Sequence, residues 1–222
     1  MQAKPVVSAF LMLGIVTCAA QIRRGQEPLC KQEGTARADI TDADATILGF
    51  TIAHASLEDV QAKLGSTELR RVSKDEESDV SICYVSPADR TILVFYSGAM
   101  GGWKDITWFA LWSREAMYPH SSECASSSLV SRNLATVSGL RLGLTKKELE
   151  KIAGRPTKDG TRSVKYDYVC RSKMTADEVK GMKDVNGWDA TSDPYFDRMS
   201  WIEVLYAHGA ASRLDIGRIE SY

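Results

Sequence analysis

Histidine and cysteine are scarce in this chain of 222 residues, and its basic and acidic side chains nearly balance. Three histidines and five cysteines leave little material for a metal centre, and no two cysteines have the C-x-x-C spacing typical of zinc sites. The formal net charge of −1 gives no basis for a nucleic-acid-binding surface. We therefore expect no metal, no cofactor and no nucleic-acid partner.

Recognisable catalytic motifs are missing as well. The sequence contains no nucleophile elbow, no zinc-protease helix motif and no phosphate-binding glycine loop. The glycines at 98, 101 and 102 are not followed by a helix pattern that could present a phosphate site, and they fit a hairpin connection instead. We expect a non-enzymatic protein, with an enzyme of unrecognised type as the alternative.

Long apolar runs are absent except at the start of the chain. Lys4 precedes an apolar stretch at 6–16, which leads to small residues at Ala19 and Ala20. This order is typical of a secretory signal peptide, and the stretch is too short to span a bilayer. We expect residues 1–20 to be a signal peptide and the mature chain to be exported, periplasmic or secreted, with no membrane span. The alternative is a lipid anchor at Cys18, which would hold the protein in the outer membrane.

Two short helices are predicted from their end signals. In the stretch 143–156, Thr145 is an N-cap and Glu148 follows three residues later, which is the pattern of a capping box. Gly154 ends this helix, because glycine readily takes the left-handed conformation found at helix C-termini. Residues 55–65 show the same arrangement, with a serine cap and a final glycine.

Similar segments follow both helices and indicate an internal duplication. The tripeptide at 94–96 is echoed at 204–206 and the Asp-Ile pair at 105–106 at 215–216, so both share an offset of 110 (204 − 94 and 215 − 105). We predict a first repeat at 21–128, with an N-terminal arm and a linker, and a second repeat at 129–222 with a polar insertion at Met174–Phe196.

The expected fold class is α+β, with two tandem repeats that each pack a short helical element on an antiparallel β-sheet. Alternating and apolar patterns place the strands at 78–86, 91–96, 105–113, 163–171, 200–207 and 213–220.

Four cysteines remain outside the signal region, and an even number in an exported chain indicates disulfide bonds. Four cysteines allow three pairings. The duplication favours Cys30–Cys83 and Cys124–Cys170, because each bond would then lie within one repeat. Free buried thiols are the alternative.

Three tryptophans are candidates for binding a partner. Trp108 and Trp112 share one face of the strand expected at 105–113, because side chains alternate along a strand. The corresponding place of Trp108 in the second repeat is Arg218, a polar residue, so we expect this face to be open to solvent. Trp201 lies on a similar face of its own strand. Exposed aromatic patches commonly mark partner sites; the alternative is that all three side chains belong to the core.

The pattern Gly143-Leu-Thr145-x-x-Glu148-Leu149-x-x-Ile152-x-Gly154-x-Pro156 resembles the signature of a superfamily of bacterial exported proteins. The superfamily includes the β-lactamase inhibitor proteins, which carry two tandem copies of the unit, and the outer-membrane assembly lipoproteins of the SmpA/OmlA (BamE) type. The resemblance implies a protein-binding module outside the cytoplasm, one form of which is an inhibitor of another protein. An envelope lipoprotein that scaffolds an outer-membrane assembly is the alternative. The family's binding contacts align with no residue of this chain.

Overall fold

The computed structural model describes residues 29–31, 39–71, 79–176, 179–180 and 195–221. Two eight-residue helices, α1 (Leu57–Leu64) and α2 (Lys146–Ala153), begin and end where the sequence predicts. The backbone N–H of Asp59 donates to Ser56 Oγ at 3.1 Å, and that of Glu148 donates to Thr145 Oγ1 at 3.3 Å. Both acidic side chains accept in return from the cap backbone, so the predicted capping boxes are confirmed.

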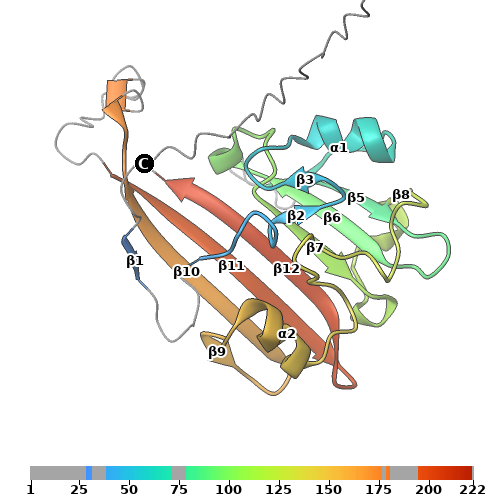
Figure 1. Cartoon of the computed structure of the whole chain (residues 1–222). Helices are drawn as coiled ribbons and strands as arrows, with labels where there is room; N and C mark the ends of the chain where they lie inside the picture. The colour runs from blue at the N-terminus through green and yellow to red at the C-terminus, as the bar shows by residue number, and fades with distance from the viewer. Residues whose placement is uncertain (1–28, 32–38, 72–78, 177–178, 181–194, 222) are drawn as a thin grey trace, which may run out of the picture.

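Strands make up most of the remaining regular structure (Figure 1). They are β1 (Leu29–Lys31), β2 (Thr46–Ile47), β3 (Phe50–Thr51), β4 (Arg70–Arg71), β5 (Val80–Val85), β6 (Ile92–Ser97), β7 (Trp108–Trp112), β8 (Ala125–Ser126), β9 (Lys158–Asp159), β10 (Ser163–Lys173), β11 (Tyr195–Ala207) and β12 (Ala210–Ser221). Three short 3₁₀ turns are η1 (Ala99–Gly101), η2 (Arg114–Ala116) and η3 (Ser121–Glu123).

Ten of these strands form one sheet in the order β1-β10-β11-β12-β7-β6-β5-β4, with β9 beside β10 and β8 beside β5. The β5–β8 pair is parallel, and the other pairs of this sheet are antiparallel. The two strands β2 and β3 form a separate small sheet. The long strands β10 to β12 and the shorter strands β5 to β7 therefore lie side by side in a continuous surface (Figure 1).

The expected fold class is wrong. The described residues are dominated by one large sheet with two short helices, and two separate helix-on-sheet repeats are not evident. The sheet is continuous because β7 pairs with β12 over five register positions, from Trp112↔Arg213 to Trp108↔Gly217. Local sequence patterns could not reveal this pairing, because it joins residues about 100 positions apart through hydrogen bonds of the backbone.

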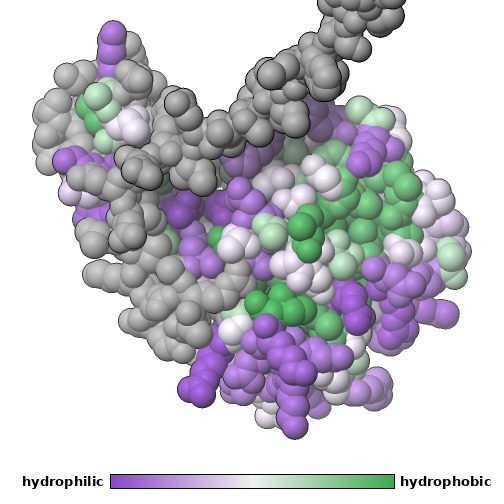
Figure 2. Space-filling view, in the orientation of Figure 1, coloured by the Kyte–Doolittle hydropathy of each residue, from purple (hydrophilic) through white to green (hydrophobic). Residues whose placement is uncertain are grey.

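The main core lies between the helices and one face of the sheet, which we call the helix face. Leu57 and Val60 of α1 and Leu149 of α2 belong to the same buried cluster as Phe109 of β7 and Ile216 of β12. A single core therefore underlies both helices and joins β5, β6 and β7 to β10, β11 and β12. In Figure 2, which views this side, hydrophobic residues gather near β5 and β6, and hydrophilic residues cover α2.

The expected disulfide pairing is also wrong. Cys83 of β5 is bonded to Cys124, in the segment that leads into β8, and so neither Cys30–Cys83 nor Cys124–Cys170 can form. The pairing was derived from the duplication, and it failed because the segment before β8 folds back onto β5. Cys170 is also disulfide-bonded, and in the backbone register of β1 and β10 it lies opposite Cys30.

Disulfide bonds in the described residues are compatible with an oxidising, exported location. None of the described helices is long and apolar enough to cross a membrane. The predicted signal peptide, Cys18 and most of the insertion Met174–Phe196 lie outside the described residues.

Candidate binding surface

The face of the large sheet opposite the helices, which we call the open face, carries all three candidate tryptophans. Side chains of alternate strand residues point to the same side, and the register places Trp112 beside Arg213 and Trp108 beside Gly217. Trp201 of β11 lies opposite Gly217 on its other side. Trp201 on β11 and the two tryptophans on β7 thus share one face of the sheet, with β12 between the two strands.

A segment at residues 113–127, which we call the covering segment, packs over the open face of β5, β6 and β7. Its Tyr118 is buried in a second hydrophobic cluster with residues of these strands, namely Cys83, Val85, Ile92, Val94, Tyr96 and Ala110, with Trp108, Trp112 and Cys124 at the margin. This half of the open face therefore has a small core of its own.

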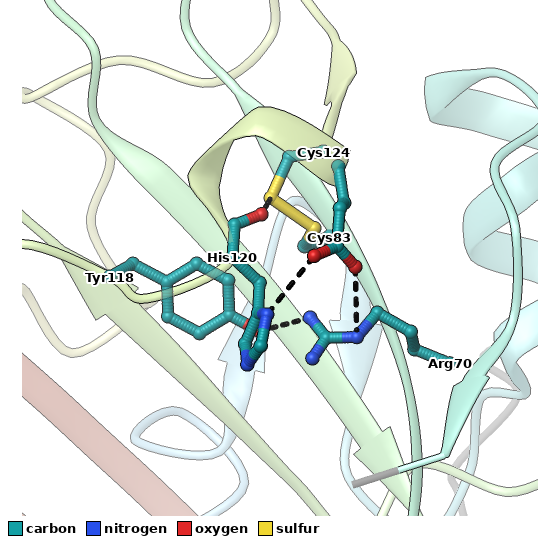
Figure 3. The surroundings of a disulfide bond; sticks show 6 residues. Arg70, Cys83, Tyr118, His120 and Cys124 are labelled. Atoms are coloured by element: carbon teal, nitrogen blue, oxygen red, sulfur yellow. Dashed lines mark hydrogen bonds and ion pairs between the residues drawn. A yellow bond between two sulfur atoms is a disulfide. The ribbon is translucent and has the colours of Figure 1, made fainter.

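Figure 3 shows how the covering segment is attached. The Cys83–Cys124 disulfide joins it to β5. Next to the disulfide, the Glu123 carboxylate contacts two basic side chains. Its Oε2 lies 3.2 Å from Arg70 Nε, and its Oε1 lies 3.0 Å from His120 Nδ1. Because one member of this polar cluster comes from β4 and the others from the covering segment, the cluster holds the segment against the edge of the sheet.

The open face of β10, β11 and β12 is different, because no described segment covers it. Val169 of β10 and Met199 of β11 are register partners and are 46% and 41% exposed. Lys165 and Asp167 form an ion pair on the same face, with Nζ at 2.9 Å from Oδ1. Apolar and charged side chains are therefore presented together on this half.

Aromatic rings form a row across the boundary between the two halves. The Trp201 ring lies directly on Gly217, so close that a Cβ at that position would be 2.0 Å from the ring. On the next strand Trp108 stacks on Tyr96, with ring centroids 3.4 Å apart and planes within 3°. We call Trp201, Gly217, Trp108 and Tyr96 the aromatic row; the two tryptophans in it are half-buried and each keeps an accessible part.

Trp112 lies beside this row and forms part of a charged site. The guanidinium carbon of Arg213 is 4.0 Å from the centroid of the Trp112 ring, in cation–π geometry. The same guanidinium binds Asp215, with Nη2 at 2.7 Å from Oδ1 and Nε at 2.6 Å from Oδ2. Arg213 is thereby fixed between an aromatic ring and a carboxylate.

Asp215 is 2% exposed, which is unusual for a carboxylate. Burial raises the pKa of Asp215 to about 6 against the opposing effect of Arg213, and the charge of Glu203 raises it further. Glu203 of β11 is the register partner of Asp215, so two carboxylates lie directly opposite each other beside the aromatic row.

One premise behind the tryptophan hypothesis does not hold. Arg218 was expected to mark a solvent-exposed position, but it is 7% exposed and lies on the helix face, where it binds Asp42 Oδ1 at 2.8 Å and the Ile40 carbonyl at 2.9 Å. The residue that faces Trp108 is Gly217. The tryptophans are half-buried for a reason unrelated to Arg218, since Tyr96, Arg213 and Tyr118 pack on them.

Sequence reasoning missed Gly217 and the Arg213–Asp215 pair. A glycine inside a strand pattern commonly marks a close approach of another group, and Gly217 lies within the strand expected at 213–220. Opposite charges two residues apart in a strand lie on the same face, so the spacing of Arg213 and Asp215 could have predicted an ion pair there.

The comparisons with known proteins found no matching protein family, no matching curated protein and no matching solved structure.

Proposed function

We propose that the protein is an exported, non-enzymatic module that binds another protein on the open face, with Trp108, Trp112 and Trp201 as anchors. The observation that carries the proposal is the aromatic row, which continues into the exposed Val169 and Met199 on the uncovered half of the same face. The disulfide-bonded cysteines support an exported location, periplasmic or secreted.

Half-buried, rigid aromatic side chains suit protein recognition. Their packing on Tyr96, Gly217 and Arg213 fixes the rings before a partner arrives, so little side-chain entropy is lost on binding. Tryptophan and arginine are the residue types that most often dominate the energy of a protein interface. The resemblance of the α2 stretch to the superfamily of the β-lactamase inhibitor proteins points in the same direction and makes inhibition of the partner part of the proposal.

The test uses the mature chain as bait for proteins of the cell envelope and culture fluid. Trp201→Ala and Trp112→Ala should each weaken capture of the partner by at least about 2 kcal/mol, or roughly thirtyfold. Trp103→Ala is the matched control, because Trp103 is 39% exposed but lies in the turn after η1, outside the sheet.

Thermal unfolding of each variant separates binding from folding. Equal capture by all three variants would contradict the proposal. A loss of capture that merely follows a loss of folded protein would show that the tryptophans are structural.

A further inference from the structure

A cleft beside α2, separate from the open face, is lined by several positively charged side chains. It measures about 770 Å³ and lies where the first residues of α2, the turn before β10 and the β11–β12 hairpin meet. Its lining includes Lys146, Lys147, Arg162, His208 and Tyr206. We call it the cationic cleft. Three cationic side chains and a histidine converge there in a chain whose formal net charge is −1.

The backbone fixes two of these elements. His208 and Gly209 both have positive φ, 52° and 80°, and link the register partners Ala207 and Ala210, which is the geometry of a two-residue hairpin turn. The backbone N–H of Tyr206 donates to the Arg162 carbonyl at 2.9 Å, and so the turn before β10 is held against β11. Arg162 and His208 are therefore presented from anchored loops.

Not all of the positive charge is neutralised within the protein. Lys146 Nζ lies 2.6 Å from Asp159 Oδ1 and 5.8 Å from the Tyr206 ring centroid. Lys147 and Arg162 are exposed and form no ion pair within the described part of the chain. At the N-terminus of α2 the backbone N–H groups of Glu148 and Thr145 already have acceptors in the capping box, so we attribute the attraction for an anion mainly to the side chains.

Tyr206 supplies a separate observation. Its hydroxyl oxygen is buried and has no hydrogen-bond partner among the described residues. Leaving a buried hydroxyl unpaired costs free energy, and a bound water or ion is one explanation of such a group. In a cleft lined by cations, a hydroxyl donor favours a ligand that accepts hydrogen bonds.

We propose that the cationic cleft binds a phosphate-type oxyanion, held by Lys147 and Arg162 with Lys146, His208 and Tyr206 around it. Arginine and lysine are the side chains that proteins use for phosphate recognition, arginine because its planar fork matches two oxygens at once. The proposal is independent of the function proposed for the open face. A phosphate group can be free in solution or carried by a lipid, and the experiment has an arm for each source.

In the first arm, inorganic phosphate and pyrophosphate are titrated into the mature chain and binding is followed by calorimetry and by amide chemical shifts. Shifts should centre on Lys147, Arg162 and His208. Lys147→Gln and Arg162→Gln should each weaken binding about tenfold, because each removes a charge-assisted hydrogen bond. Tyr206→Phe should weaken binding by a smaller factor and leave the fold intact.

The matched control is the double variant Lys151→Gln/Arg155→Gln, compared with Lys147→Gln/Arg162→Gln. Both remove two positive charges, but Lys151 and Arg155 lie at the other end of α2, outside the cleft. The control should bind as the wild type does. Equal weakening in both double variants would show that overall charge attracts the anion, and it would overturn the proposal.

In the second arm, vesicles of phosphatidylglycerol and of phosphatidylcholine are sedimented with the same proteins. Binding of free phosphate that depends on the cleft residues supports a soluble ligand. If the protein sediments with phosphatidylglycerol vesicles and not with phosphatidylcholine vesicles, and the Lys147→Gln/Arg162→Gln variant does not sediment with either, the result supports a phosphate carried by a lipid. If neither probe binds at millimolar concentration, the proposal is wrong.

Discussion

The two halves of the open face differ in what lies on them. Over β5, β6 and β7 the covering segment buries Ile92, Val94 and Tyr96. Over β10, β11 and β12 the described residues leave Val169 and Met199 substantially exposed. One sheet thus carries a closed half and an accessible half on a single face.

The difference shows how this fold keeps an accessible surface beside a stable core. The closed half is apolar and joined by a disulfide, whereas the accessible half alternates apolar residues with paired charges such as Lys165–Asp167. Paired charges limit the exposed apolar area and so lower the tendency to aggregate. The aromatic row lies where the halves meet, so its rings are supported from the closed side.

The largest expected effect comes from detaching the covering segment. The Cys83–Cys124 bond spans 41 residues, so replacing both cysteines by alanine should lower the free energy of unfolding by about 4 kcal/mol in the chain-entropy model. Urea denaturation measures this change. Binding of a hydrophobic dye to the native variant should rise, because Val85 and Ile92 become accessible. Unchanged dye binding would mean that the covering segment stays in place without its disulfide, and unchanged stability would contradict the predicted entropic contribution.

A pair of truncations on the same face compares the halves directly. Ile92→Ala, in the closed half at 4% exposure, should cost about 3 kcal/mol because it leaves a cavity. Met199→Ala, in the accessible half at 41% exposure, should cost less than about 1 kcal/mol. Chemical denaturation of both variants is the measurement. If Met199→Ala proved as costly as Ile92→Ala, the second half would be covered as well.

Asp215 lies at the boundary and should make stability depend on pH. Because its pKa is raised to about 6 in the folded protein, the folded state binds this proton more tightly than the unfolded state does. The contribution of Asp215 is then most favourable below about pH 4 and is lost as the pH rises through about 6, by about 3 kcal/mol. Other carboxylates with lowered pKa values, such as Asp89 and Asp42, act in the opposite direction.

Asp215→Asn isolates this contribution. The difference in unfolding free energy between the variant and the wild type should change between pH 4 and pH 6 and stay constant above about pH 7. Arg213→Gln serves as the companion variant, since the loss of the guanidinium should raise the pKa of Asp215 and move the transition to higher pH. A pH-independent difference would show that Asp215 is ionised throughout this range.

The sequence predicted the local elements well and their assembly poorly. Caps and stop residues are short-range signals, so both helices were placed correctly, and all six expected strands occur within a few residues of the expected ranges. The pairing of β7 with β12 and the return of residues 113–127 over β5 depend on contacts far apart in sequence. For this reason Tyr118 and Cys124, which lie in the segment expected to link the two repeats, pack in or against the second hydrophobic cluster.

Part of the candidate site could be found in the same way. Strand periodicity placed Trp108 and Trp112 on one face, because only residues of one strand were involved. That Trp201 lies across Gly217 from Trp108 required the order of the strands in the sheet. The burial of Arg218 required its partner Asp42, which is 176 residues away.

The smallest expected effect concerns the helix face, where the two halves are alike. Both α1 and α2 have a capping box, formed by Ser56 and Asp59 in α1 and by Thr145 and Glu148 in α2. Ser56→Ala and Thr145→Ala should each cost about 1 kcal/mol, because each leaves a helix N–H without its acceptor.

Thr145→Ser is the matched control and should keep nearly the full stability, since the hydroxyl remains. Urea denaturation at neutral pH is the measurement. Equal losses in the two alanine variants would show that the halves differ on the open face alone, whereas a loss confined to one variant would show that the two helices contribute unequally to the shared core.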